Sequence, residues 1–496
     1  MIRLLSSGYG SVIAALTTAA LCSGCAVGPD FVRPKAPDVD AFTREPVVAT
    51  ATVGVHGGES QRLVSDSEVL PQWWTAFGSP ALNELVEQAL RHNPSIDSAK
   101  AALRVAHENV AAQYGVYFPV IQANYAGARQ RNPVGTISPT LASGEPLYTL
   151  HTAQMSVGYV PDVFGLNRRT IESLAAQEEA QGFQLRAAYM TIATNVVSAA
   201  IQEASLSAQV QAANEIIASS RQALDLIRRQ AELGAASDLD IATQASALAQ
   251  AEQSLPPLVK QLEQTRNLIA VLTGRMPSQG VKGGFDLEAL SLPRDLPVSL
   301  PSSLVERRPD VRAAEAQLHA ASAQVGVVIA NRLPQFSIVG LFGGTSTAFA
   351  RMFSSDNKFW GISGNVGQTV FDFGTLRHRQ LAAEAALEQV GAQYRSTVLT
   401  AFQNVADALH ALQADAKTLV AAANAESAAR RTLDLTRRQI ELGAVNAFAL
   451  FSAEQSYQQA RLALIQAQAA RFTDTAGLFL ALGGGWPDAE QLSAVQ

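Results

Sequence analysis

Residues that could perform catalysis occur in this sequence, but none of them has the spacing of a catalytic motif. No two of the seven histidines show the HExxH spacing of a zinc hydrolase, and there is no cysteine ligand pair. A GxSxG nucleophile turn and a GxxxxGK[ST] phosphate loop are also missing, so the chain carries no motif for acyl transfer or nucleotide hydrolysis. The sequence therefore predicts no catalytic residue, no metal site and no cofactor. The histidines are His56, His92, His107, His151, His319, His378 and His410.

Cys25 is the residue whose chemistry the sequence does predict. An apolar run from Val12 to Leu21, preceded by Arg3 and followed by small residues, is typical of an export signal. The run LCSGC resembles the lipobox of bacterial lipoproteins, in which the last Cys takes a diacylglycerol and becomes the mature N-terminus, although Cys22 stands where Leu is usual. Cleavage would leave one thiol, which an oxidising periplasm disfavours unless it is acylated. The alternative is a plain secretory signal.

Composition excludes two broad classes of protein. The 37 basic and 43 acidic residues give a net charge of −6 without a long basic run, so we expect no nucleic-acid partner. No run of 18 apolar residues follows the signal, which excludes a bundle of membrane-spanning helices. If the chain spans a bilayer, it must do so with strands.

An internal repeat defines the architecture. The segment RQALDLIRRQAELGA at Arg221–Ala235 recurs as RRTLDLTRRQIELGA at Arg430–Ala444, with eleven of fifteen positions identical and an offset of 209 residues. Around Pro94 and Pro309 the offset is 215, so one loop is longer in the first copy. The chain therefore reads as a tandem duplication with about 200 residues in each unit.

The repeat sets the expected domain boundaries. We expect a signal peptide at 1–24, a lipidated extended tether at 25–75, a first repeat at 76–290, a second repeat at 291–485 and a tail at 486–496. Each repeat is expected to contain a β-hairpin (about 118–163 and 333–373), a very long helix (about 166–232 and 375–441) and a returning helix (about 237–274 and 446–481).

Both long helices carry the 3.5-residue period of a coiled coil. In the first, apolar residues recur in steps of four and three from Leu185 to Ala231, with only Glu203 and Ser220 as interruptions, and the second repeats the pattern at 394–440. A helix of this extent is ~100 Å long, because each residue rises about 1.5 Å. The many alanines on these faces suit a tube wall of closely packed helices. An ordinary antiparallel coiled-coil stalk is the alternative.

The hairpin segments alternate between apolar and polar residues with a period of two. Ile121, Ala123 and Tyr125 alternate with polar residues in the first repeat, as Trp360 and Ile362 do in the second. These runs fit membrane strands, and a soluble hairpin packed on the helices is the alternative. Four strands cannot close a barrel, and an open edge cannot lie in lipid. Two chains would give a filled eight-strand barrel, whereas three would give twelve strands and a channel.

These features together resemble the TolC-type outer-membrane efflux channels, closest to their lipoprotein, OprM-like branch. The matching segments cover most of the mature chain. They are CAVGPDFVRP after the signal, WWTAFGSPALNELVEQALRHNPSIDSA at Trp73–Ala99, the strand-to-helix junctions VPDVFGLNRR (Phe164, Gly165) and TVFDFGTLRHR (Phe373, Gly374), and the turns LGAASDLDIA and LGAVNAFALF.

The resemblance implies a mainly α fold with membrane β-structure. It implies a homotrimer with a twelve-strand β-barrel in outer-membrane lipid and a twelve-helix α-barrel in the periplasm. Such channels are passive exit ducts for an inner-membrane pump, often of the resistance-nodulation-division type, which they engage through a periplasmic adaptor protein. The alternative function is that of a lipid-anchored periplasmic adaptor or scaffold without a pore.

The resemblance also implies a periplasmic gate where the helix pairs turn, at Gly234 and Gly443. In OprM-like channels a bulky apolar ring and an Asp ring close this tip. These positions fall on Phe448 and Ser452, so any acidic ring would need Asp238 or Asp240. We expect Phe448 to close the gate, with Leu239 as its first-repeat counterpart. The alternative is that both are knobs between neighbouring helices.

Overall fold

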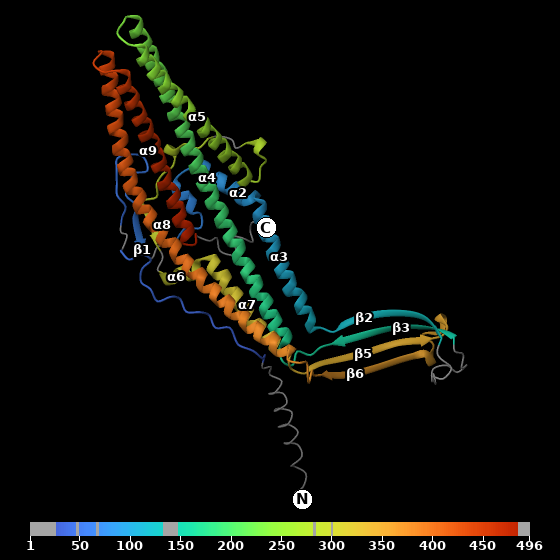
Figure 1. Ribbon diagram of the computed structural model, residues 1–496. Coiled ribbons are helices and arrows are strands. Elements are labelled where there is room, and N and C mark those ends of the chain that lie inside the picture. Colours follow the sequence, from blue (N-terminus) through green and yellow to red (C-terminus); the bar gives the residue numbers. More distant parts are fainter. Residues whose placement is uncertain are drawn as a thin grey trace. The chain divides into compact units, whose positions relative to one another are not determined.

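The computed structural model describes residues 26–45, 49–65, 69–131, 147–280, 284–298 and 301–484. The predicted signal peptide and tail, and Cys25, lie outside these stretches. The chain divides into two compact units, the first made of 1–33, 102–181 and 314–394, and the second of 34–101, 182–313 and 395–496. The main helices are α2 (Pro80–His92), α3 (Pro94–Tyr114), α4 (Leu166–Glu232), α5 (Asp238–Leu272), α6 (Pro301–Arg307), α7 (Pro309–Ala330), α8 (Thr375–Glu441) and α9 (Ala447–Ala481) (Figure 1).

The first unit contains one four-stranded antiparallel sheet in the order β2-β3-β5-β6 (Figure 1). Each repeat contributes one hairpin: β2 (Val120–Arg131) with β3 (Leu147–Tyr159), and β5 (Gln335–Ser346) with β6 (Lys358–Gly367). The pairing of β3 with β5 joins the two hairpins. Among the described residues, the outer edges of β2 and β6 have no strand partner.

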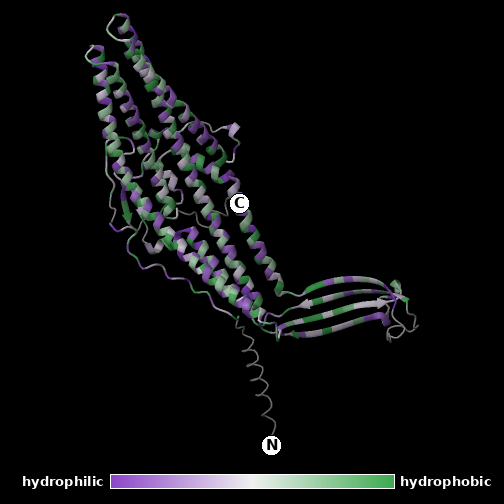
Figure 2. Ribbon diagram, viewed as in Figure 1, coloured by the Kyte–Doolittle hydropathy of each residue, from purple (hydrophilic) through white to green (hydrophobic). Residues whose placement is uncertain are grey.

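The register places the predicted apolar residues on one face of this sheet. Ile121 lies opposite Val157, Val157 opposite Gly340, and Gly340 opposite Ile362, so these four residues form one row across the sheet. The next row on this face runs from Ala123 through Met155 and Phe342 to Trp360. The outermost members are open to the surroundings, since Trp360 is 77% and Ile362 76% exposed. Figure 2 shows hydrophobic and hydrophilic residues interleaved along these strands.

The helices have matched lengths in the two repeats. Helices α4 and α8 each contain 67 residues, and α5 and α9 each contain 35. The apolar positions that make up the predicted 3.5-residue period of α4, here called the seam, are Leu185, Tyr189, Ile192, Val196, Ala199, Leu206, Val210, Ala213, Ile217, Leu224, Ile227 and Ala231. Nine of these twelve are buried, among them Val196, Leu206 and Ile227. The residues with the 3.5-residue period therefore form the packing face of a long helix, as predicted. Burial of this apolar face supplies most of the stability of the helix.

In the second unit, part of the predicted tether packs against α9. Thr50 and Gln61 are buried and joined by backbone hydrogen bonding, and Gln61 Nε2 donates to Thr475 Oγ1 at 3.0 Å. Strand β1 (Arg62–Ser65) then runs parallel to β4 (Asp295–Val298). This part of the predicted tether therefore docks against α9 and β4.

Candidate functional site

Each strand-to-helix junction combines a positive-φ residue with an aspartate that caps the following helix. Gly165 has φ 76°, and Asp162 accepts hydrogen bonds from the amides of Asn167 (2.9 Å) and Arg168 (2.8 Å). In the second repeat Asp372 accepts from the amides of Gly374 (2.9 Å) and Leu376 (2.8 Å). These amides lower the pKa of Asp372, with the Leu376 amide the main cause. An acidic side chain at a helix N-terminus satisfies amides that have no partner within the helix.

Phe373 at the second junction has φ 55°, a conformation that glycine adopts far more readily than a side-chain-bearing residue. Its side chain is 90% exposed, and its ring lies 4.6 Å from that of Phe371, which is 75% exposed. Gly374 follows with φ 88°. The second junction therefore presents two adjacent aromatic rings on a strained backbone.

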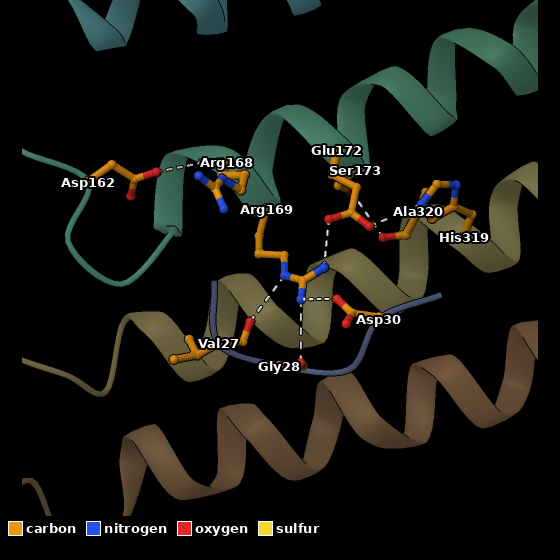
Figure 3. Close-up of polar contacts among 10 residues, drawn as sticks. All are labelled: Val27, Gly28, Asp30, Asp162, Arg168, Arg169, Glu172, Ser173, His319 and Ala320. Carbon is orange, nitrogen blue, oxygen red and sulfur yellow. Dashed lines mark hydrogen bonds and ion pairs between the residues drawn. The ribbon is translucent and has the colours of Figure 1, made fainter. Parts of the chain in front are cut away.

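The first junction also receives the beginning of the described chain. Residues 26–33, here called the N-terminal strap, run along α4 and α7 in the first unit. Arg169 of α4 is 4% exposed, and its Nη2 donates to Asp30 Oδ1 at 2.7 Å while its Nη1 donates to Glu172 Oε2 at 2.7 Å. Its Nε donates to the Val27 carbonyl at 3.1 Å, and Figure 3 shows the guanidinium directed into the strap.

Two further contacts hold the strap on α7. The ring of Phe31 stacks on that of His319 at 4.5 Å, and His319 Nε2 lies 3.1 Å from Glu172 Oε1. Arg33 Nε pairs with Glu315 Oε1 at 2.8 Å. Burial opposes the charge of Arg169, but the hydrogen bonds to Asp30 and Glu172 outweigh it, so the pKa of Arg169 is raised. The strap is thus held by the buried Arg169 of α4, in the first repeat, and by the ring of His319 of α7, in the second.

The predicted gate residues lie at the two helix turns of the second unit. Gly234 and Gly443 end α4 and α8 with φ 72° and 70°, and the amide of the residue after each glycine bonds back to Gln230 or Gln439. Leu239 is 74% and Phe448 64% exposed. A cavity of about 580 Å³ lies between the turns, lined by residues that include Ile227, Asp240, Ile440 and Ala449.

The two aspartates predicted at the gate, Asp238 and Asp240, differ in whether their carboxylates already accept hydrogen bonds within the turn. Asp240 forms a capping box, because its Oδ2 accepts from the Ser237 amide (2.9 Å) and hydroxyl (2.6 Å), while its own amide donates to Ser237 Oγ. The Ser237 hydroxyl is the main cause that lowers the pKa of Asp240, and the amide of Ala447 adds to it. Asp238 and Ser452 are exposed. Asp240 is therefore already used to hold its own turn, which leaves Asp238 as the exposed acidic side chain of the pair.

Glu203 and Ser220, the two polar residues that interrupt the apolar period of α4, are buried and hydrogen-bonded. Glu203 accepts from Arg266 Nε at 3.0 Å and from the Phe285 amide at 2.8 Å. Ser220 Oγ donates to Glu454 Oε2 at 3.0 Å, and Gln244 Nε2 donates to the same oxygen. The sequence marked Ser220 and Glu203 as breaks in the pattern, but it gave no sign of their partners on α5 and α9.

A second buried polar cluster surrounds Arg471, which is 0% exposed. Its Nη2 donates to Gln61 Oε1 at 2.9 Å and to the Glu59 carbonyl at 3.0 Å. Asp415 lies near it, and burial followed by a hydrogen bond with Asp474 raises the pKa of Asp415 to about 7. Sequence reasoning missed this cluster, because its members lie on separate segments and show no local motif.

Two findings concern residue classes rather than single sites. Within the described stretches, no three His, Cys, Asp or Glu side chains are grouped so that they could hold a metal ion. None of the helices in those stretches combines the length and apolarity that a bilayer crossing requires.

Comparison with known proteins gives consistent matches over nearly the whole chain. The family described as "Outer membrane efflux protein" matches residues 85–275 and 300–484, once in each repeat. The chain is 30% identical over 450 residues to the pyoverdine export outer membrane protein OpmQ of Pseudomonas putida, covering 89% of this chain and 94% of that protein. It is 26% identical over 482 residues to the toluene efflux pump outer membrane protein TtgC of Pseudomonas putida, covering 96% of each. The structure resembles the outer-membrane channel OprN with a TM-score of 0.80, at 26% identity, covering 93% of this chain and 100% of that one.

Proposed function

We propose, since the chain belongs to the outer membrane efflux protein family, that it forms the outer-membrane duct of a three-part export system. An inner-membrane pump, acting through a periplasmic adaptor, delivers the cargo, and the duct conducts it passively to the exterior. The single observation that carries the proposal is the four-stranded sheet, which exposes one apolar face and whose edge strands β2 and β6 have no outer partner among the described residues.

The unpaired edges support assembly from several copies. Backbone groups in lipid must be hydrogen-bonded within protein, so β6 of one copy is expected to pair with β2 of the next. Three copies would supply twelve strands, enough to enclose an aqueous pore, and would bring together six long and six shorter helices. The other sheet face carries Gln122, Asn124, Gln154 and Ser156, which suit a wet and uncharged lumen.

The helix turns of the second unit are the proposed gate. The exposed Phe448 and Leu239 side chains would meet those of the other copies at the pore axis. Asp238 and Ser452 would supply polar groups beside them. Gly234 and Gly443 permit the tight reversals that bring these side chains to the tip.

Cys25 is the proposed lipid attachment site. The N-terminal strap that begins one residue later supports this role, since Ala26 lies against Gly165 at the strand-to-helix junction. A diacylglycerol on Cys25 would therefore be attached one residue before the segment that lies against this junction.

The proposed cargo is drugs or other toxic compounds, and the pump selects among them. Relatives of similar identity are named for pyoverdine export and for toluene efflux, so family membership alone does not fix the cargo. We propose a proton-driven pump of the resistance-nodulation-division type as the energy source.

Charge placed on the two sheet faces tests the proposal. Trp360→Lys with Ile362→Lys puts two cations on the apolar face, where a cation costs about 2–4 kcal/mol at mid-bilayer depth and less toward the interfaces, so we expect loss of the heat-modifiable trimer and of export. The matched pair Ser363→Lys with Asn365→Lys lies on the polar face and should keep the trimer. Trimer migration, planar-bilayer conductance and drug tolerance of a channel-deficient strain are the readouts. A wild-type protein that stays monomeric and water-soluble without detergent would overturn the proposal.

A further inference from the structure

The connection between β5 and β6 folds back over the apolar face of the sheet. A Cβ built on Gly344 would lie 2.0 Å from the Met352 carbonyl oxygen and 3.2 Å from a ring carbon of Phe353. Gly344 lies opposite Ala153, which lies opposite Tyr125, so its missing side chain would point to the apolar face. Glycine is required here because the Met352 backbone occupies the space of a side chain.

Aromatic contacts fix the connection on the same face. The Phe349 ring meets the rings of Tyr125 (5.9 Å) and His151 (5.7 Å) edge-on. Tyr125 and His151 are themselves hydrogen-bonded at 2.9 Å. The connection is closed on itself, because Asn357 Nδ2 donates to the Arg351 carbonyl at 2.7 Å. Segment 347–357 is therefore an ordered cap on the outward side of the sheet, and it does not fold over the polar face.

The side chains that this cap exposes are aromatic and basic. Phe349 is 62% and Phe353 55% exposed, and Arg351 stands between them with its side chain open to the surroundings. Lys358 begins β6 opposite Gly344, on the same face. Rings and cations side by side on an outward face are typical of a membrane interface, where rings lie at headgroup depth and cations meet lipid phosphates.

The end of β2 adds two more cations. Arg129 and Arg131 are exposed and follow Tyr125 at steps of two residues, so they share its face beyond the aromatic cluster. The described residues at this end of the sheet include one carboxylate, that of Asp356, and four basic side chains: Arg129, Arg131, Arg351 and Lys358. This end lies far from the helix starts at Leu166 and Thr375 within the first unit (Figure 1).

The geometry points to a binding surface for the phosphorylated glycolipid of the outer leaflet, made by Phe349 and Phe353 at headgroup depth and by Arg129, Arg131, Arg351 and Lys358 at its phosphates. The inference rests on the proposed function, because it needs this end of the sheet at the outer surface of the outer membrane. Charge complementarity selects the occupant, since the described residues of this end of the sheet carry four cations and one carboxylate, a balance that matches a headgroup with phosphates.

The test uses the purified full-length trimer in detergent and two fluorescent probes, a bisphosphorylated lipid A and its dephosphorylated form. We expect saturable binding of the phosphorylated probe only, and no competition by inorganic phosphate at equal concentration. Replacing the four basic residues by Gln should weaken binding about fivefold for each charge removed, because a cation near an anionic lipid surface contributes roughly that factor. The control Arg430→Gln removes one exposed charge from α8 and should leave binding unchanged.

A second variant separates the cap from its charges. Gly344→Ala keeps every cation but displaces the Met352 backbone, so binding should weaken although the net charge is unaltered. Equal affinity of wild type and the fourfold Gln variant, or equal binding of the dephosphorylated probe, would overturn the inference. Failure of the proposed function gives a different result: the wild-type protein would then neither assemble into trimers nor conduct in phosphate-free bilayers.

Discussion

Gly28 of the N-terminal strap and Gly326 of α7 meet backbone to backbone: a Cβ on Gly28 would lie 2.4 Å from the Cα of Gly326. Gly28 also has φ 100°, which side-chain-bearing residues rarely adopt. Gly28→Ala should therefore lift the strap from α7 at a cost of about 1–3 kcal/mol. Faster protease cleavage within 26–45 would report this release. Gly54→Ala, at a glycine with open space around it, should leave cleavage unchanged.

Arg169 should hold the same strap through charge. Arg169→Met removes the donor to Asp30, Glu172 and Val27, and should lower the free energy of unfolding in urea by about 1–3 kcal/mol. Arg379 of α8 is an exposed arginine of the same unit, so Arg379→Met is the control and should cost at most about 0.5 kcal/mol, the usual scale for surface changes. Equal losses for the two variants would show that the buried guanidinium does not hold the strap.

Asp415 should make stability depend on pH. Its pKa is raised to about 7 in the folded protein, so the native state keeps a proton that the unfolded chain releases above roughly pH 4. Stability should then fall as pH rises from about 4 to about 7, and level off above that. For this half-buried group we expect about 1–2 kcal/mol after allowance for solvent screening.

The variant Asp415→Asn removes this titration. Unfolding midpoints measured between pH 4 and pH 8 should then vary less than in the wild type, and the variant should be the more stable protein at pH 8. Asp407→Asn, an exposed aspartate on the same helix, is the control and should keep the wild-type slope. An identical slope in Asp415→Asn would assign the pH dependence to other groups.

Phe448 and Leu239 should set the resting conductance of the closed channel. Truncating both to Ala removes two exposed apolar side chains at the turns, so the single-channel current in planar bilayers should rise severalfold. Leu268→Ala removes a half-exposed apolar side chain elsewhere on α5 and should not change the current. An unaltered current in the double variant would favour the interpretation that both residues pack between neighbouring helices.

The helices and strands could be predicted from the sequence because their apolar residues recur with a regular local period. Most side-chain contacts between distant segments could not be predicted, because they leave no such local pattern. The seam from Leu185 to Ala231 and the alternation around Ile121 reflect burial of one face, which leaves a direct record in residue spacing. The clamp of Arg169 on Asp30 joins residues 139 positions apart and leaves no such record. Ser220 is intermediate: its polarity within an apolar seam signalled a special position, but only the structure identified Glu454 as its partner.

The identical helix lengths in the two repeats constrain how this protein can change. Removing seven residues from α4 alone would draw its turn back by about 10 Å while that of α8 stayed in place. The cavity between the turns could then no longer form. Insertions and deletions should therefore be tolerated only when α4, α5, α8 and α9 all change by the same number of residues. The conduit can thus become longer or shorter only if all four helices change together.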